Sequence, residues 1–113
     1  MRPIPKKLLI HTVTLHRKIS SDMWGKTQLD EGTVLAYVRM EPSSKVVRDM
    51  NGAEIQLAAT LFYDCKNSRP QGFMFHEDDI VLFNGQKHKV ISVEPLYDEK
   101  FLHHYEMGLV KHA

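Results

Sequence analysis

The sequence has 113 residues, of which 42% are hydrophobic and 26% are charged, so it has the size and composition of one globular domain. The formal net charge is +1. The single cysteine, Cys65, excludes an internal disulfide and a zinc site built from cysteines. No apolar run approaches the roughly 18 residues of a membrane-spanning helix. We therefore expect residues 1–113 to form a single domain that does not contact a membrane.

Positive charge is concentrated at the N-terminus. Residues 1–20 contain five basic residues and no acid, whereas residues 53–113 contain six bases and nine acids. The sequence therefore predicts a basic arm over residues 1–7, carried by Arg2, Lys6 and Lys7. Such an arm contacts nucleic acid or an acidic partner, or it simply keeps the chain solvated. The near-neutral total charge argues against a dedicated duplex-DNA-binding domain.

Apolar and polar residues alternate along much of the chain, which is typical of strands with one face on a core and the other in water. The alternation predicts strands over 8–17, 33–41, 54–66 and 101–110. The residues expected to face the core are Leu9, Val13 and Leu15; Val34, Ala36, Val38 and Met40; Ile55, Leu57, Ala59, Leu61, Tyr63 and Cys65; and Phe101, Tyr105, Met107 and Leu109.

A hairpin is the clearest local signal. Residues 79–83 and 88–93 are apolar strand segments on either side of Asn84-Gly85, a dipeptide that favours a tight turn because both positions tolerate positive φ. Pro95 is expected to end the returning strand, because proline has no N–H to donate to a ladder.

Two long connections remain, over 18–32 and 42–53, and either has room for a short strand or helical turn. In the second, residues 46–48 could form a ribbon with 53–57 through a turn at Asn51-Gly52. About six short strands, one tight hairpin and no convincing helix indicate a mainly β fold. We expect a small antiparallel β-barrel with two long loops.

The search for catalytic chemistry gives little. His103 and His104 are adjacent, and neighbouring residues of a strand point to opposite faces, so the pair is not expected to bind one metal ion. His11 and His103 are expected to be hydrogen-bonded groups at the edge of the core. Cys65 lies in an apolar stripe and is expected to be a buried, inert thiol. Without a nucleophile elbow, phosphate loop or dinucleotide fingerprint, we expect neither an enzyme nor a cofactor.

Several separated stretches resemble the minor capsid proteins of tailed phages and prophages of low-GC Gram-positive bacteria. They comprise residues 3–13 (PIPKKLLIHTV), 38–45 (VRMEPSSK), 55–64 (IQLAATLFYD), 67–70 (NSRP), 93–97 (VEPLY) and 102–106 (LHHYE). Residues 78–85, followed by Val90 and Val93, are also similar to the barrel hairpin of phage head–tail joining proteins.

The resemblance implies a structural virion component without catalytic residues. By the likeness to joining proteins, we expect a ring of copies in the neck, which closes the filled head and supports the tail. The expected partners are further copies of the chain, a portal or adaptor protein and a tail terminator protein, with a contact to packaged DNA through the basic arm. The expected location is the virion, and the bacterial cytoplasm during assembly.

In such a ring, the two long connections would be the interaction loops. Trp24, the only tryptophan, is either an interface contact or a cap on the open end of the barrel. The residues predicted to carry the loop contacts are Trp24, Lys26, Lys45, Val46, Val47 and Arg48.

Two other interpretations stay open at this stage. The protein could be a tail-completion or terminator component, because a shared small-barrel fold does not fix a position in the virion. It could also be a small barrel that binds single-stranded nucleic acid. That function needs solvent-facing aromatic residues beside basic ones, and the available candidates are Tyr37 and Phe62, without a basic cluster next to them.

Overall fold

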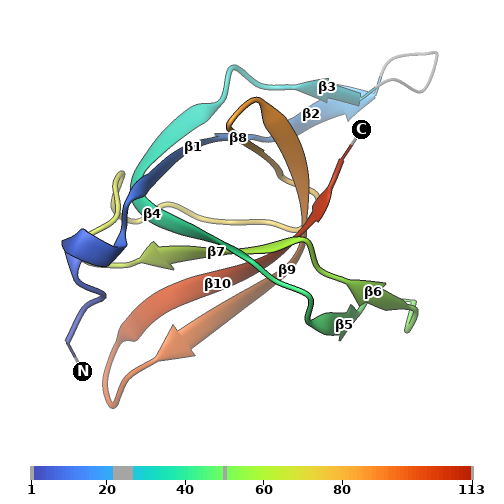
Figure 1. Cartoon of the computed structure of the whole chain (residues 1–113). Coiled ribbons are helices and arrows are strands. Elements are labelled where there is room, and N and C mark those ends of the chain that lie inside the picture. The colour runs from blue at the N-terminus through green and yellow to red at the C-terminus, as the bar shows by residue number, and fades with distance from the viewer. Residues whose placement is uncertain (1, 22–26, 50, 113) are drawn as a thin grey trace.

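The computed structural model describes residues 2–21, 27–49 and 51–112 (Figure 1). Six strands form a closed antiparallel barrel, as the sequence predicts. In order around the barrel they are β1 (His11–His16), β4 (Thr33–Pro42), β7 (Ala59–Asp64), β10 (Leu102–Lys111), β9 (Gln86–Tyr97) and β8 (Ile80–Phe83), which pairs with β1 again. A short 3-10 helix, η1 (Lys6–Leu8), precedes β1.

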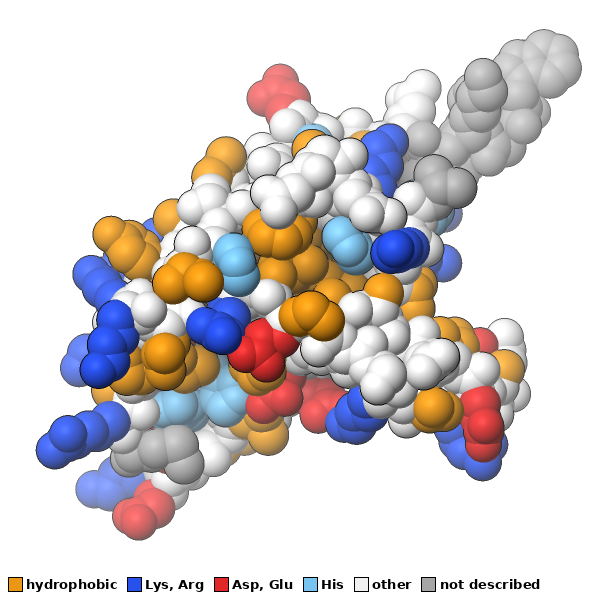
Figure 2. Space-filling model, in the orientation of Figure 1, with side chains coloured by type: hydrophobic (Ala, Val, Ile, Leu, Met, Phe, Trp, Pro, Cys, Tyr) orange, Lys and Arg blue, Asp and Glu red, His pale blue; other side chains and the backbone are white. Residues whose placement is uncertain are grey.

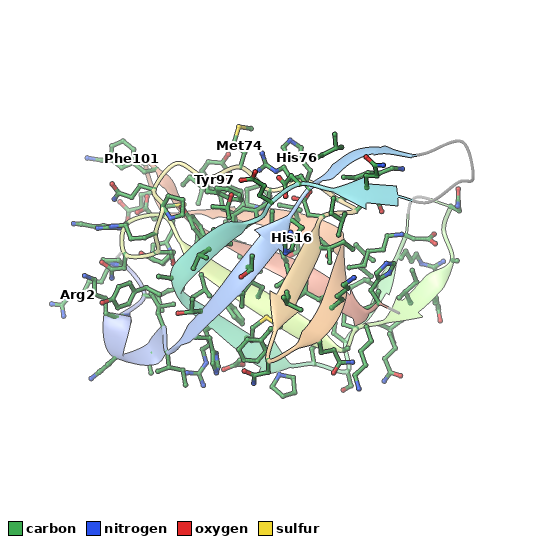
Figure 3. All side chains as sticks on the ribbon, turned by 90° about the horizontal axis from the view of Figure 1, so that it is seen from above. Arg2, His16, Met74, His76, Tyr97 and Phe101 are labelled. Atoms are coloured by element: carbon green, nitrogen blue, oxygen red, sulfur yellow. The ribbon has the colours of Figure 1, made fainter. Side chains whose placement is uncertain are left out.

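Two ribbons of two strands each leave the barrel: the first lies within the connection 18–32, and the second joins the connection 42–53 to residues 54–56. The first ribbon joins β2 (Lys18–Ser21) to β3 (Thr27–Leu29), and the second joins β5 (Val46–Arg48) to β6 (Glu54–Gln56). The pairing of β5 with β6 confirms the predicted ribbon. The single strand predicted over 54–66 is wrong, because the structure divides it into β6 and β7. Both ribbons lie on one side of the barrel, and the N-terminal arm lies on the opposite side (Figures 1 and 3).

Side chains from every barrel strand fill the interior. The fully buried inward residues include Val13, Leu15, Leu35, Val38, Leu61, Val81, Val90, Met107 and Leu109. Phe75, from the connection between β7 and β8, also belongs to this core. Its ring packs edge-on against Tyr63 and Tyr105, with ring centroids 5.0 and 5.4 Å apart. This long connection therefore supplies core residues that the strand periodicity does not reveal.

The alternation predicted for β4 is wrong over its first half. Val34 is 60% exposed, whereas Leu35 is fully buried, and the predicted phase returns at Val38 and Met40. The cause is a bulge, in which the three-residue step from Leu35 to Val38 spans a two-residue step on β1. Tyr37 adopts a positive φ of 56° within the bulge. An extra residue inverts the faces of a strand, so the two halves of β4 follow opposite phases.

Two expectations at the far end of the sheet are also wrong. β9 continues through Pro95, which lies opposite Tyr105, because β8 ends its pairing with β9 at Lys89. Beyond that point one edge of β9 has no neighbouring barrel strand, and an edge tolerates proline. Phe101 is 71% exposed because it lies in the β9–β10 turn, where its N–H donates to Asp98 Oδ1 at 2.8 Å.

Candidate interaction surfaces

The N-terminal arm is pinned to the barrel by a buried carboxylate. Asp64 is fully buried at the end of β7, and its Oδ1 accepts the N–H of Ile4 at 2.9 Å. Its Oδ2 accepts the N–H groups of Lys66 and Asn67 at 3.1 and 2.8 Å. The side-chain amide of Asn67 then donates to the carbonyl of Ile4 at 2.8 Å. Both backbone groups of Ile4 are therefore held by the turn that follows β7.

The turn after β7 is itself seated on the bulge of β4. Ala36 and Arg69 exchange backbone hydrogen bonds of 2.9 and 3.0 Å. The hydroxyl of Ser68, which is fully buried, donates to the carbonyl of Tyr37. The backbone groups of the bulge therefore form hydrogen bonds with the turn at residues 67–70. The same turn holds the arm.

Basic side chains project from the same side of the molecule as the arm. Lys and Arg side chains gather at the left of Figure 2, where Figure 1 shows the N-terminus. The predicted arm residues Arg2, Lys6 and Lys7 are all exposed. The ammonium of Lys6 lies 4.9 Å from the centre of the Tyr37 ring, a cation–π contact. Residues of the arm therefore lie against the barrel, through Ile4 and Lys6.

A shallow apolar hollow lies between the arm and the barrel wall. Ile4, Leu8, Leu9 and Phe62 line it, together with an ion pair of 2.6 Å between Arg39 and Glu41. Leu8 remains 45% exposed beside it.

The two aromatic residues considered for single-stranded nucleic acid already have partners. Phe62 is half-buried and stacks on the His104 ring, with centroids 6.4 Å apart. Tyr37 carries Lys6 over its ring. One face of each ring is therefore already in contact with an imidazole or an ammonium group, and a base would have to use the other face.

A chain of hydrogen bonds joins the arm to the outer wall of the barrel. His103 Nε2 lies 2.6 Å from the carbonyl of Arg2, and its Nδ1 lies 2.7 Å from Nδ1 of His104. His104 Nε2 lies 2.9 Å from Glu106 Oε2. The expectation that the two histidines point to opposite faces is therefore wrong, because the register of β10 shifts between Leu102 and His104. The expectation of a hydrogen-bonded His11 is confirmed, since its Nδ1 accepts the N–H of Met40 at 2.9 Å.

The β5–β6 ribbon carries four of the predicted loop residues. Val46 is 55% exposed and Val47 is half-buried. Arg48 is exposed, lies 3.5 Å from Glu54 across the ribbon and donates to the carbonyl of Gly52 at 3.0 Å. The carbonyl of Lys45 accepts the N–H of Leu57 at 2.8 Å, which closes the base of the ribbon. Trp24 and Lys26 lie outside the residues that the structure describes.

The ribbon is seated on the barrel at a glycine. Leu57 is buried although it lies outside the barrel strands, and it covers Gly108 of β10. A Cβ at Gly108 would lie 3.0 Å from a methyl group of Leu57 and 2.5 Å from the hydroxyl of Ser92. The N–H of Ala58 donates to the carbonyl of Leu109 at 2.8 Å. Gly108 therefore leaves the space that lets the ribbon approach the wall.

Sequence reasoning missed Asp64, Asn67 and Gly108, which position the arm and the ribbon. Asp64 lies at an alternating polar position that resembles any solvent-facing residue, and only its place just before the Asn67-Ser68 turn could have pointed to a buried acceptor. Gly108 within a predicted strand is a known sign of close backbone approach, and that signal was available.

The described residues hold little that points to catalysis. Burial, followed by the charge of Asp64, raises the pKa of the Cys65 thiol and so disfavours the reactive thiolate. Cys65 is half-buried rather than fully buried, so the expected burial is only partly correct. Among residues 2–21, 27–49 and 51–112, no three His, Cys, Asp or Glu side chains are placed to hold a metal ion. In the same part of the chain, no helix has the length and apolar character needed to cross a membrane.

Comparison with known families gives a match to most of the chain. The sequence pattern of a family described as minor capsid protein covers residues 5–109. The match includes both ribbons, residues 5–7 of the arm and all six barrel strands apart from the last two residues of β10. Searches of curated proteins and of solved structures gave no match.

Proposed function

The chain belongs to the minor capsid protein family, a family of phage structural proteins, and on that premise we propose that it is a neck component that forms a ring between portal and tail. In this role it closes the DNA-filled head and provides the platform for tail attachment. Family membership supports a structural role in the virion, and the position in the neck is our inference.

The observation that carries the proposal is the difference between the two sides of the molecule. Two ribbons project on one side, and the basic arm with its apolar hollow lies on the other (Figures 1 and 3). A ring is built from heterologous contacts, in which one patch meets a different patch of the next subunit. A molecule with distinct surfaces on opposite sides has the geometry that such contacts need.

The ribbon residues suggest how one contact is made. Val46 exposes an apolar side chain on a short ribbon whose neighbouring strand carries Glu54 paired with Arg48. Exposed apolar residues rimmed by charges are typical of contact sites between proteins. We assign the ribbon to the contact with another copy or with the portal or adaptor. The arm is assigned to an acidic neighbour.

Electron microscopy of lysates from a phage that lacks this gene tests the proposal. Separate heads and tails, with heads that lose DNA, are expected. Complete virions would refute the neck role, and stable DNA-filled heads without tails would move the protein to the tail side of the joint, as a terminator component.

Complementation with matched variants tests the ribbon separately. Val46 and Val34 have similar exposure, 55% and 60%, but Val34 lies on the barrel wall. We expect V46D to reproduce the defect of the deletion and V34D to restore virions. Equal rescue by both variants would remove the ribbon from the interface.

A further inference from the structure

A basic hollow lies where the β2–β3 ribbon meets the barrel, on the side away from the arm. Lys18 of β2, Lys87 and Lys89 of β9, and His112 after β10 surround it, and its apolar lining comes from Leu29 and Ile80. Figure 1 shows the C-terminal end of the chain beside the β2–β3 ribbon, in agreement with His112 as a lining residue. Three separate parts of the chain therefore deliver basic side chains to one place.

The positive charge of this hollow is only partly balanced. Asp78 is the single carboxylate in its lining, and it forms an ion pair of 3.2 Å with Lys89. Neither Lys18 nor Lys87 forms an ion pair with another residue of the described ranges 2–21, 27–49 and 51–112. Three lysines and one carboxylate line the hollow, so it has an excess of two positive charges.

Side chains and backbone groups that can donate hydrogen bonds continue beyond the basic hollow. A second open hollow adjoins it at the β8–β9 turn and is lined by Asn84, Gly85 and Gln86, and it shares Lys87 and His112 with the first. Amide side chains and a glycine backbone offer neutral hydrogen-bond donors beside the ammonium groups. A row of donors of this kind suits a ligand with repeated negative charges better than a single small anion.

We propose that this row of donors, which we call the lysine surface, binds the phosphodiester backbone of duplex DNA without reading its sequence. The cationic side chains are lysines and a histidine, with no arginine. Lysine binds phosphate as a point charge, and the planar arginine fork, which recognises phosphates, carboxylates and base edges with fixed geometry, is missing from this lining. Point-charge contacts to the phosphate backbone carry no sequence information, which is the mode of binding proposed here.

The absence of stacking groups selects the duplex over a single strand. No Phe, Tyr or Trp occurs among the described residues that line the two hollows. Proteins that hold single strands stack the bases on such rings. Because the net charge of the chain is only +1, binding is expected to be weak and strongly dependent on salt. Packaged DNA is the polyanion available inside a virion, so the inference needs a place in the virion but not the neck ring.

Fluorescence anisotropy with a short labelled duplex at low and increasing salt tests the proposal on the full chain. We expect the double variant K18E/K87E to bind about tenfold more weakly and to lower the slope of log K against log salt by about 2. The matched control is K66E/K100E, which removes the same charge from two exposed lysines on the side of the arm. The control should change the affinity by less than about twofold.

The neutral variant K18Q/K87Q keeps the test valid if charge reversal impairs folding, and it should lower the salt slope by the same amount. No binding by the unmodified chain at low salt, or equal losses in the two charge-reversal variants, would overturn the proposal. A labelled poly-glutamate peptide that binds more tightly than the duplex, and is lost in K18Q/K87Q, would assign the lysine surface to an acidic protein instead. Failure of the neck proposal leaves these outcomes unchanged.

Discussion

Replacing Asp64 by asparagine should loosen the arm and destabilise the fold. The carboxylate accepts three backbone N–H groups, from Ile4, Lys66 and Asn67, and it is fully buried. An amide keeps one oxygen but turns an NH2 group toward the remaining donors. Hydrogen bonds to a charged group contribute about 1.5–3 kcal/mol each, and a buried donor left unpaired costs about 1–3 kcal/mol. We therefore expect D64N to lower the free energy of unfolding by about 3 kcal/mol.

Urea unfolding measures the stability, and limited trypsin digestion of the folded protein reports on the arm, because trypsin cleaves after Lys6 and Lys7. N67A is the matched control, since it removes only the 2.8 Å bond from the Asn67 amide to the carbonyl of Ile4 and should cost about 1 kcal/mol. D64N should be cut in the arm several times faster than the unmodified chain, with N67A between them. A D64N protein with unchanged unfolding and unchanged arm cleavage would show that the carboxylate does not hold the arm.

Three further measurements have expected outcomes. G108A should destabilise the protein by about 1–3 kcal/mol in urea unfolding, and the cost should shrink in an L57A/S92A background, because the new methyl group meets the Ser92 hydroxyl and the Leu57 side chain. Burial raises the pKa of Asp79, so the folded state keeps a proton that the unfolded chain loses near pH 4, and stability falls as the pH rises from there to the folded pKa. D79N, whose amide oxygen can still accept the N–H of His76, should abolish that fall, measured by urea unfolding across this range. The Cys65 thiol, whose pKa burial raises, should be alkylated more slowly than a free thiol at mildly alkaline pH; an equal rate would contradict the assigned environment.

The fold class was predictable because the barrel strands obey a local rule. In β1 and β7 every predicted inward residue is buried, from Val13 and Leu15 to Leu61 and Tyr63. The turn at Asn84-Gly85 was predictable for the same reason, since both residues adopt positive φ, of 50° and 76°. Pattern and turn chemistry act within a few residues, so the sequence alone contains them.

The predictions that were wrong concern side-chain faces that depend on partners distant in the chain. The bulge in β4 places Tyr37 at positive φ, and its backbone is stabilised by Ser68 and Arg69, more than 30 residues away. The contact between His103 and His104 likewise results from a register shift against β9. Nothing in the local alternation of these residues records such distant pairings, so the predicted faces were wrong at both places.

The sequence predicted the positions of the candidate surfaces only in part. It did not predict that the two surfaces are connected through one strand. The basic arm and the β5–β6 ribbon were both predicted, but the structure shows that both depend on β7. The ribbon enters β7 through Leu57 and Ala58, which are seated on Gly108 and Leu109 of the neighbouring strand. The arm is held at the other end of the same strand by Asp64.

A six-residue strand spans only about 20 Å. The two surfaces proposed to meet neighbouring subunits are therefore connected through one short element of the core. In the proposed ring, a shift of the ribbon would reach the anchor of the arm through hydrogen-bonded backbone rather than through a flexible linker. A substitution that loosens either end of β7 is therefore expected to change the relative placement of both surfaces, even where neither contact residue is altered.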